Sequence, residues 1–152
     1  MKHQQGFSLI ELMIAVVIVG IITAVAIPNY SDYVTRSRVP EATAALGDLR
    51  VRMEQFFQDN RTYPTGGCVV APTAPTATQV SVALGSSFDF TCAATATTFT
   101  VTAAGKGPMA GFQYTLNQFN TRATNFSGAA AAAGWTSHTP NSCWVTKKGG
   151  KC

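Results

Sequence analysis

The chain has 152 residues, enough for one domain and an extension. Charged residues make up 12% of the sequence, which is low for a soluble protein, while hydrophobic residues make up 46%. The formal net charge is +4 at pH 7, too mild to argue for nucleic-acid binding by itself. Any such function has to be argued from local clusters of residues.

The N-terminal segment from Phe7 to Ile27 is apolar on every face and contains one charged residue, Glu11. Its 21 residues would form a helix of about 31 Å, close to the thickness of a bilayer's hydrocarbon core. Lys2 and His3 precede the segment, which predicts an N-terminus on the cytoplasmic side. We therefore expect this segment to span a membrane.

Glu11 does not fit a plain membrane span. A carboxylate in a lipid-embedded helix costs several kcal/mol, and less near the end of the helix, where the side chain reaches the interface. A charge in such a place indicates a partner of opposite sign. The obvious partner for Glu11 is a positive group on a neighbouring copy of the chain.

The residues around this charge resemble the N-terminus of the type IV pilin family, in the class with a short leader. The shared features are Gly6, the sequence FSLIEL directly after it, and an apolar run to Pro28. The resemblance implies that a prepilin peptidase cuts between Gly6 and Phe7 and N-methylates Phe7, and that Glu11 docks each subunit on its neighbour's terminal amine. The expected domains are a leader (1–6), a transmembrane and assembly helix (7–28) and a globular head (29–152).

Two other interpretations fit parts of the N-terminus. Ala24-Val25-Ala26 is a small-x-small site, as in a secretory signal peptide, but the run before it is long for a signal peptide and contains Glu11. An ordinary single-span anchor is the second interpretation. It leaves both Gly6-Phe7 and Glu11 unexplained.

The head is predicted to be an α+β fold. From Asp32 to about Asn60 the sequence is helical, with one apolar stripe made of Ala42, Leu46, Leu49, Met53 and Phe56. Apolar and polar residues then alternate over residues 88–92, 98–102 and 112–117, which predicts three strands, and residues 120–124 are a fourth candidate. Residues 69–79 read as a loop, and residues 128–134 as a loop or a short helix. A helix with one apolar stripe and an antiparallel sheet with one apolar face bury each other.

Four cysteines follow the apolar segment, on the side where an oxidising compartment is expected. They allow three pairings. The stretch from Cys143 to Cys152 resembles a hairpin with its ends linked and Gly149-Gly150 in the turn, so we pair Cys143 with Cys152 and Cys68 with Cys92. This C-terminal pair also resembles the disulfide-bounded region of type IV pilins. None of the cysteines has CxxC spacing, so no metal site is expected.

The sequence contains no enzyme motif, and neither catalytic activity nor a cofactor is expected. The leading interpretation is a major or minor pilin, a structural subunit of a type IV pilus that serves twitching motility, adhesion or DNA uptake. Its partners would be other pilin subunits, the prepilin peptidase and, before assembly, the inner membrane; the final location would be the extracellular filament. A pseudopilin of a type II secretion system is the alternative. The C-terminal cysteine pair favours the pilus, and the last sixty residues lack the acidic cluster that would favour a calcium-binding pseudopilin.

A DNA-binding head is the remaining interpretation. Lys147, Lys148 and Lys151 lie close in sequence to Trp144. Basic and aromatic side chains together suit phosphate contact and base stacking. A solvated basic loop is the alternative explanation for the same residues.

Overall fold

The computed structural model describes residues 7–70, 79–82 and 85–152, with only the backbone for residues 25–29 and 69–70. The leader expected at residues 1–6, including Gly6, lies outside the described residues, as does most of the expected loop at 69–79. The chain forms two compact units, residues 1–34 and residues 35–152, and each is described by itself.

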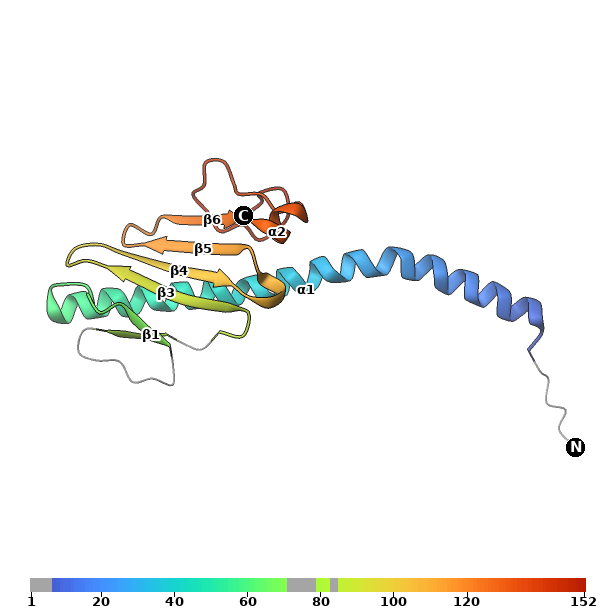
Figure 1. Ribbon diagram of the computed structural model, residues 1–152, viewed down its shortest axis with the longest axis horizontal. Helices are drawn as coiled ribbons and strands as arrows, with labels where there is room; N and C mark the ends of the chain where they lie inside the picture. Colours follow the sequence, from blue (N-terminus) through green and yellow to red (C-terminus); the bar gives the residue numbers. More distant parts are fainter. Residues whose placement is uncertain (1–6, 71–78, 83–84) are drawn as a thin grey trace, which may run out of the picture. The chain divides into compact units, whose positions relative to one another are not determined.

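Helix α1 runs from Leu9 to Asn60 and contributes to both units (Figure 1). In the first unit its large apolar side chains are exposed; Leu9, for example, is 76% exposed. Among the described residues, no helix combines the length and the apolarity that crossing a membrane requires. The membrane span therefore stays a prediction.

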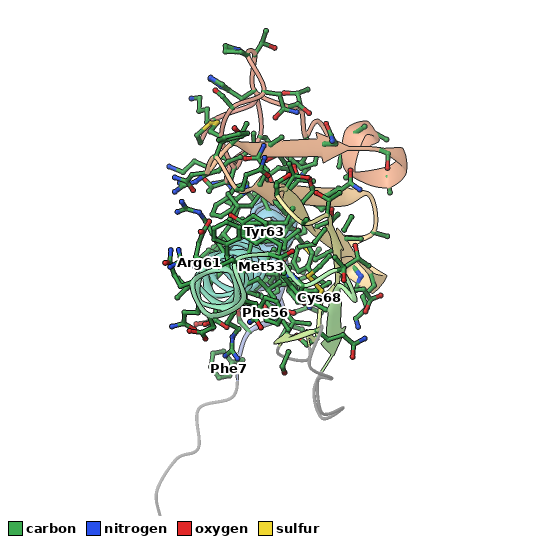
Figure 2. The ribbon with its side chains drawn as sticks, turned by 90° about the vertical axis from the view of Figure 1, so that its left-hand side faces the viewer. Phe7, Met53, Phe56, Arg61, Tyr63 and Cys68 are labelled. Atoms are coloured by element: carbon green, nitrogen blue, oxygen red, sulfur yellow. A yellow bond between two sulfur atoms is a disulfide. The ribbon has the colours of Figure 1, made fainter. Side chains whose placement is uncertain are left out.

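In the second unit α1 buries the stripe that the sequence predicted. Ala42, Leu46, Leu49 and Met53 are fully buried, and Phe56 packs against the same core. Met53 and Tyr63 are buried and Phe56 is half-buried at this end of the head (Figure 2). Residues spaced alternately by four and three positions fall on one helix face, so one side of α1 meets the core while the other carries charge.

The core lies between α1 and one face of a four-stranded antiparallel sheet (Figure 1). The strands, in spatial order, are β3 (Phe88–Ala94), β4 (Phe99–Gly105), β5 (Phe112–Asn117) and β6 (Arg122–Phe126). Buried and exposed residues alternate along β3, β4 and β5. The α+β fold predicted from the sequence is confirmed.

The last strand begins two residues later than predicted, at Arg122. Asn117 causes the shift, because its side-chain Oδ1 accepts hydrogen bonds from the backbone N–H groups of Phe119 and Thr121, both at 3.0 Å. Asn120 has a φ of 59°, a left-handed conformation that Asn tolerates better than most residues. The turn therefore extends through Thr121.

Two short strands fall at the ends of the stretch that the sequence predicted to be loop. Strands β1 (Cys68–Val70) and β2 (Val80–Val82) pair in parallel and form a second, two-stranded sheet. Strands of three residues are too short to show an alternating pattern. The short helices η1 (Gly107–Met109) and α2 (Gly128–Ala132) precede β5 and follow β6.

Both disulfides are present in the pairing that the sequence suggested. Cys68 in β1 is bonded to Cys92 in β3, with a Cα–Cα distance of 5.3 Å. Cys143 is bonded to Cys152, with a Cα–Cα distance of 6.0 Å. Between them the chain turns back through one antiparallel bridge, Lys147 to Lys151, so the predicted hairpin is only a single bridge long.

Candidate functional site

The first candidate site is the start of α1. Ser8 precedes the helix, and its Oγ accepts a hydrogen bond from the backbone N–H of Glu11 at 3.2 Å. Ser-x-x-Glu is the capping-box pattern, and an acidic side chain in a first turn is favoured by the helix dipole. Glu11 is exposed, and among the described residues it has no ion-pair partner. Cleavage before Phe7 and docking through Glu11 both stay predictions.

The second candidate site is the C-terminal segment, residues 141–152, which lies beyond β6 on the side away from β5 (Figure 1). Thr124 in β6 is fully buried and connects the segment to the sheet. Its Oγ donates to the carbonyl of Cys143 at 3.0 Å and accepts from the N–H of Val145 at 3.0 Å, and its backbone N–H donates to Oδ1 of Asn141 at 2.9 Å. The segment thereby covers the free edge of β6.

Strand β5 supplies two more anchors. The Tyr114 hydroxyl donates to the carbonyl of Val145 at 3.1 Å, and the indole N–H of Trp144 donates to the carbonyl of Thr115 at 3.0 Å. Tyr114 is fully buried, and this burial raises the pKa of its hydroxyl well above the usual value. The hydroxyl therefore stays a hydrogen-bond donor. Side chains of the sheet thus satisfy both backbone groups of Val145.

The start of β6 and the anchored segment carry four basic residues and one aromatic residue, the C-terminal basic surface: Arg122, Trp144, Lys147, Lys148 and Lys151. The guanidinium carbon of Arg122 lies 4.7 Å from the centre of the Trp144 ring, within the range of a cation–π contact. Lys147 and Lys151 are exposed and Lys148 is half-buried. No acidic residue follows Asp89 in the sequence, so this part of the chain contributes positive side chains only.

Arg122 is the residue of this surface that sequence reasoning missed as a site residue. It lies 22 positions before Trp144, at the start of β6, and no local pattern connects the two. A groove of about 430 Å³ adjoins the contact. Its walls come from α1, from the start of β6 and from the C-terminal segment: Pro40, Thr43, Ala44, Arg122, Cys143, Trp144, Thr146 and Cys152.

His138 is half-buried, and its ring Nδ1 donates to the carbonyl of Gly150 at 2.9 Å. Ligand-type atoms of His138, Cys143 and Cys152 lie within 4.8 Å of one another. The two sulfurs are bonded to each other, however, and only a thiolate ligates a metal. We therefore assign His138 to holding the C-terminal turn.

Glu41 connects α1 to the segment that precedes β3. Its carboxylate accepts a hydrogen bond from the backbone N–H of Ser87 at 2.8 Å and one from the Ser86 hydroxyl at 3.0 Å. Burial raises the pKa of Glu41, but these hydrogen bonds to the charged form outweigh burial, so the pKa lies below its ordinary value. The carboxylate is therefore ionised at neutral pH and holds this segment on α1.

Comparison with known proteins identifies the class and then the family. Residues 1–27 match the prokaryotic N-terminal methylation motif, which, with the helix and the α+β head, defines a type IV pilin. Residues 28–113 match the family described as the type IV minor pilin ComP, DNA uptake sequence receptor, and the chain belongs to this family. The resemblance to type IV pilins noted in the sequence is thus confirmed.

Individual relatives match this chain over only part of their own length. The chain is 43% identical over 61 residues to the fimbrial protein EcpC of Eikenella corrodens, covering 40% of each protein. It is 50% identical over 56 residues to the type IV major fimbrial protein FimA of Dichelobacter nodosus, covering 37% of this chain and 35% of FimA. The chain thus matches well under half of the length of these curated relatives. A solved type IV pilin from Shewanella oneidensis is 15% identical, covers 58% of this chain and 89% of that one, and superimposes with a TM-score of 0.44.

Proposed function

We propose that this chain is a minor subunit of a type IV pilus and that it binds DNA through the C-terminal basic surface. In this proposal the precursor resides in the inner membrane, the prepilin peptidase processes it before Phe7, and it enters an extracellular filament beside other pilin subunits. Its role is structural and binding, not catalytic. Family membership supports the subunit role, and the family's description favours DNA uptake over motility or adhesion.

The observation that carries DNA binding is the contact of Arg122 with Trp144 beside two exposed lysines, Lys147 and Lys151. Lysine and arginine bind DNA chiefly by neutralising phosphates and releasing counterions. Lys106, by contrast, is already neutralised by Asp89, at 2.7 Å between Nζ and Oδ1. From β3 onward, the positive side chains other than Lys106 therefore all belong to the C-terminal basic surface.

The sequence suggested that Trp144 stacks on bases, but the structure supports a different role. Its indole N–H is bound to Thr115, its ring is half-buried, and Arg122 occupies one face of the ring. The ring limits the motion of the guanidinium, so less conformational entropy is lost when Arg122 binds a phosphate. We assign Trp144 to positioning Arg122 and assign the phosphate contacts to Arg122, Lys147 and Lys151.

The test is the salt dependence of DNA binding by the detergent-solubilised full chain, measured by fluorescence anisotropy with a labelled DNA duplex. Each lost phosphate contact lowers the slope of log K against log salt by about 0.9. We expect Arg122→Ala, Lys147→Ala and Lys151→Ala each to lower the slope by about one contact. The matched control is Arg52→Ala, because Arg52 already pairs with Asp48 at 2.7 Å on α1.

Two outcomes would contradict the proposal. Unchanged slopes in all three variants would mean that this surface does not contact phosphates. An equal loss in the Arg52→Ala control would mean that binding depends on overall charge and has no defined site. Trp144→Phe separates positioning from stacking, since a positioning role predicts a weaker effect of Arg122→Ala when the indole is absent.

A further inference from the structure

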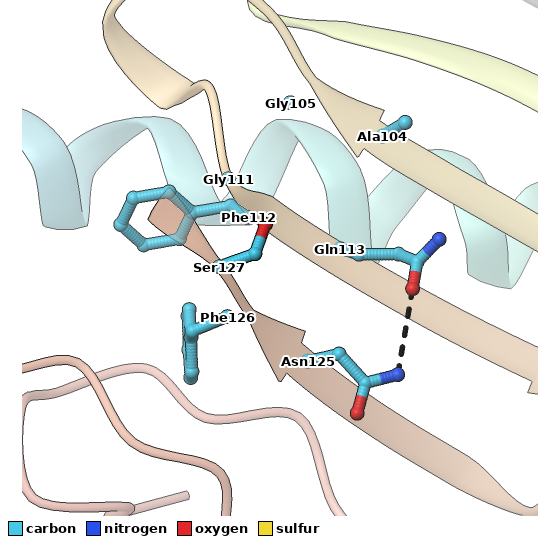
Figure 3. Close-up of a pocket in the computed structure, with 8 residues that line it drawn as sticks. All are labelled: Ala104, Gly105, Gly111, Phe112, Gln113, Asn125, Phe126 and Ser127. Carbon is cyan, nitrogen blue, oxygen red and sulfur yellow. Dashed lines mark hydrogen bonds between the residues drawn. The ribbon is translucent and has the colours of Figure 1, made fainter. Parts of the chain in front are cut away.

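The outer face of the sheet contains a third site, at the end of β6 opposite to Arg122. A row of exposed residues crosses the strands in register: Asp89 in β3, Ala104 in β4, Gln113 in β5 and Asn125 in β6. Ala104 is the smallest of the four, so it leaves a notch in the row. Here a pocket of about 260 Å³ opens between the ends of β4 and β6 and the start of β5 (Figure 3).

The amide side chains of Asn141, Asn125 and Gln113 form a ladder of hydrogen bonds that all run in one direction. The backbone N–H of Thr124 donates to Oδ1 of Asn141, so the Asn141 amide nitrogen faces Asn125 and donates to its Oδ1 at 3.1 Å. The Asn125 nitrogen then donates to Oε1 of Gln113 at 3.4 Å, the bond drawn in Figure 3. The backbone N–H of Thr124 can only donate, so it fixes which end of the Asn141 amide is the oxygen. Each amide then donates from its nitrogen to the oxygen of the next amide.

The free end of the ladder is therefore a hydrogen-bond donor. Gln113 is left with its NH₂ group, which has no partner among the described residues. The Ser127 hydroxyl also lines the pocket, and it does not cap the helix that follows it. A ligand for this pocket must consequently present oxygen acceptors to a donor whose orientation the ladder already fixes.

The pocket also limits the charge and the shape of its ligand. None of its lining residues is ionisable, and the nearby Asp89 and Lys106 neutralise each other. The rings of Phe112 and Phe126 turn away from the two amides (Figure 3), so no aromatic face lies beside the Gln113 donor for a flat base to stack on. An extended peptide would instead need a free strand edge, and the edge of β6 is covered.

We propose that this pocket binds one unit of a neutral saccharide, through hydrogen bonds from the Gln113 amide to oxygens of the sugar ring. A sugar is neutral, rich in oxygen acceptors and of a size to match the pocket. The binding is weak for a single ring, because the pocket is shallow and open.

The experiment is saturation-transfer NMR on the detergent-solubilised full chain with glucose, galactose, mannose, N-acetylglucosamine and N-acetylgalactosamine. We expect transfer to at least one of these sugars. Gln113→Glu replaces the donor by an acceptor of the same shape and should weaken binding about tenfold, and Ala104→Leu fills the notch and should abolish it. Thr100→Leu is the matched control, since Thr100 lies on the same outer face of β4 and does not line the pocket.

DNA is the second probe in the same experiment, and circular dichroism confirms that each variant is folded. Pocket variants that lose sugar binding and retain DNA affinity support the proposal. Absence of transfer to every sugar, or equal transfer in wild type, Gln113→Glu and Ala104→Leu, overturns it. A loss of DNA affinity in Gln113→Glu without any sugar binding also overturns it, and assigns this face to the DNA interface.

Discussion

Replacing Thr124 by valine should detach the C-terminal segment from the sheet. The hydroxyl of Thr124 is fully buried and serves as donor to Cys143 and as acceptor from Val145. Valine has nearly the same shape but cannot replace either bond. Removing the hydroxyl leaves the N–H of Val145 buried without a partner, at a cost of about 1–3 kcal/mol, and loses a second bond worth about 1 kcal/mol. We expect a total loss of about 3 kcal/mol.

That loss corresponds to a fall in melting temperature of about 10 °C for a head of this size. Thermal unfolding followed by circular dichroism, under non-reducing conditions, measures it. Thr124→Ser is the matched control, because it keeps the hydroxyl and removes one methyl group, worth about 1 kcal/mol. If valine at this position unfolds within about 2 °C of wild type, or if serine is as damaging as valine, the two hydrogen bonds do not hold the segment.

Three further predictions concern the N-terminus and the attachment of α1. The mature chain should begin at N-methylated Phe7, which intact mass spectrometry detects; a chain beginning at Ile27 would indicate a secretory signal peptide instead. Glu11→Gln should still be processed, but should fail to enter filaments unless wild-type subunits are present. Immunogold electron microscopy of sheared pili measures incorporation, with a blot of the membrane fraction as control. Normal incorporation of the variant alone would exclude Glu11 as the docking charge. Because the pKa of Glu41 is lowered on folding from 4.5, its contribution to stability is present above about pH 4.5 and is lost as the pH falls through the folded value. Glu41→Gln should therefore be less stable at neutral pH, with a smaller loss of stability on acidification, and identical pH profiles in urea unfolding would refute this role.

The parts of the fold that the sequence predicted are those with long repeating patterns. The buried stripe of α1 extends over four turns, and each of β3, β4 and β5 alternates over at least five residues. The start of β6 was wrong by two residues, because the Asn117 side chain extends the turn by bonding backbone groups within it. Strands β1 and β2 were missed, because three residues cannot establish a period.

The candidate sites were predictable only where their residues are close in sequence. The lysines near Trp144 lie within one ten-residue loop and were found on composition alone. Arg122 joins them through a tertiary contact over a long sequence separation, and Gln113 meets Asn125 only through strand register. Such pairs depend on how β5 and β6 align. A single sequence gives no direct measure of that alignment.

The covered edge of β6 has a consequence for assembly. A filament packs the heads of neighbouring pilin subunits at very high local concentration, which is the condition under which open strand edges pair with each other. The side chain of Asn141 occupies the backbone N–H of Thr124, which such a pairing would use, and the Thr124 hydroxyl holds the covering segment in place. Sheet-to-sheet growth is therefore blocked at this edge, and ordered polymerisation is left to the helices. A subunit whose C-terminal segment came loose would expose an aggregation-prone strand, so the correct seating of twelve terminal residues decides whether a head stays soluble among its neighbours.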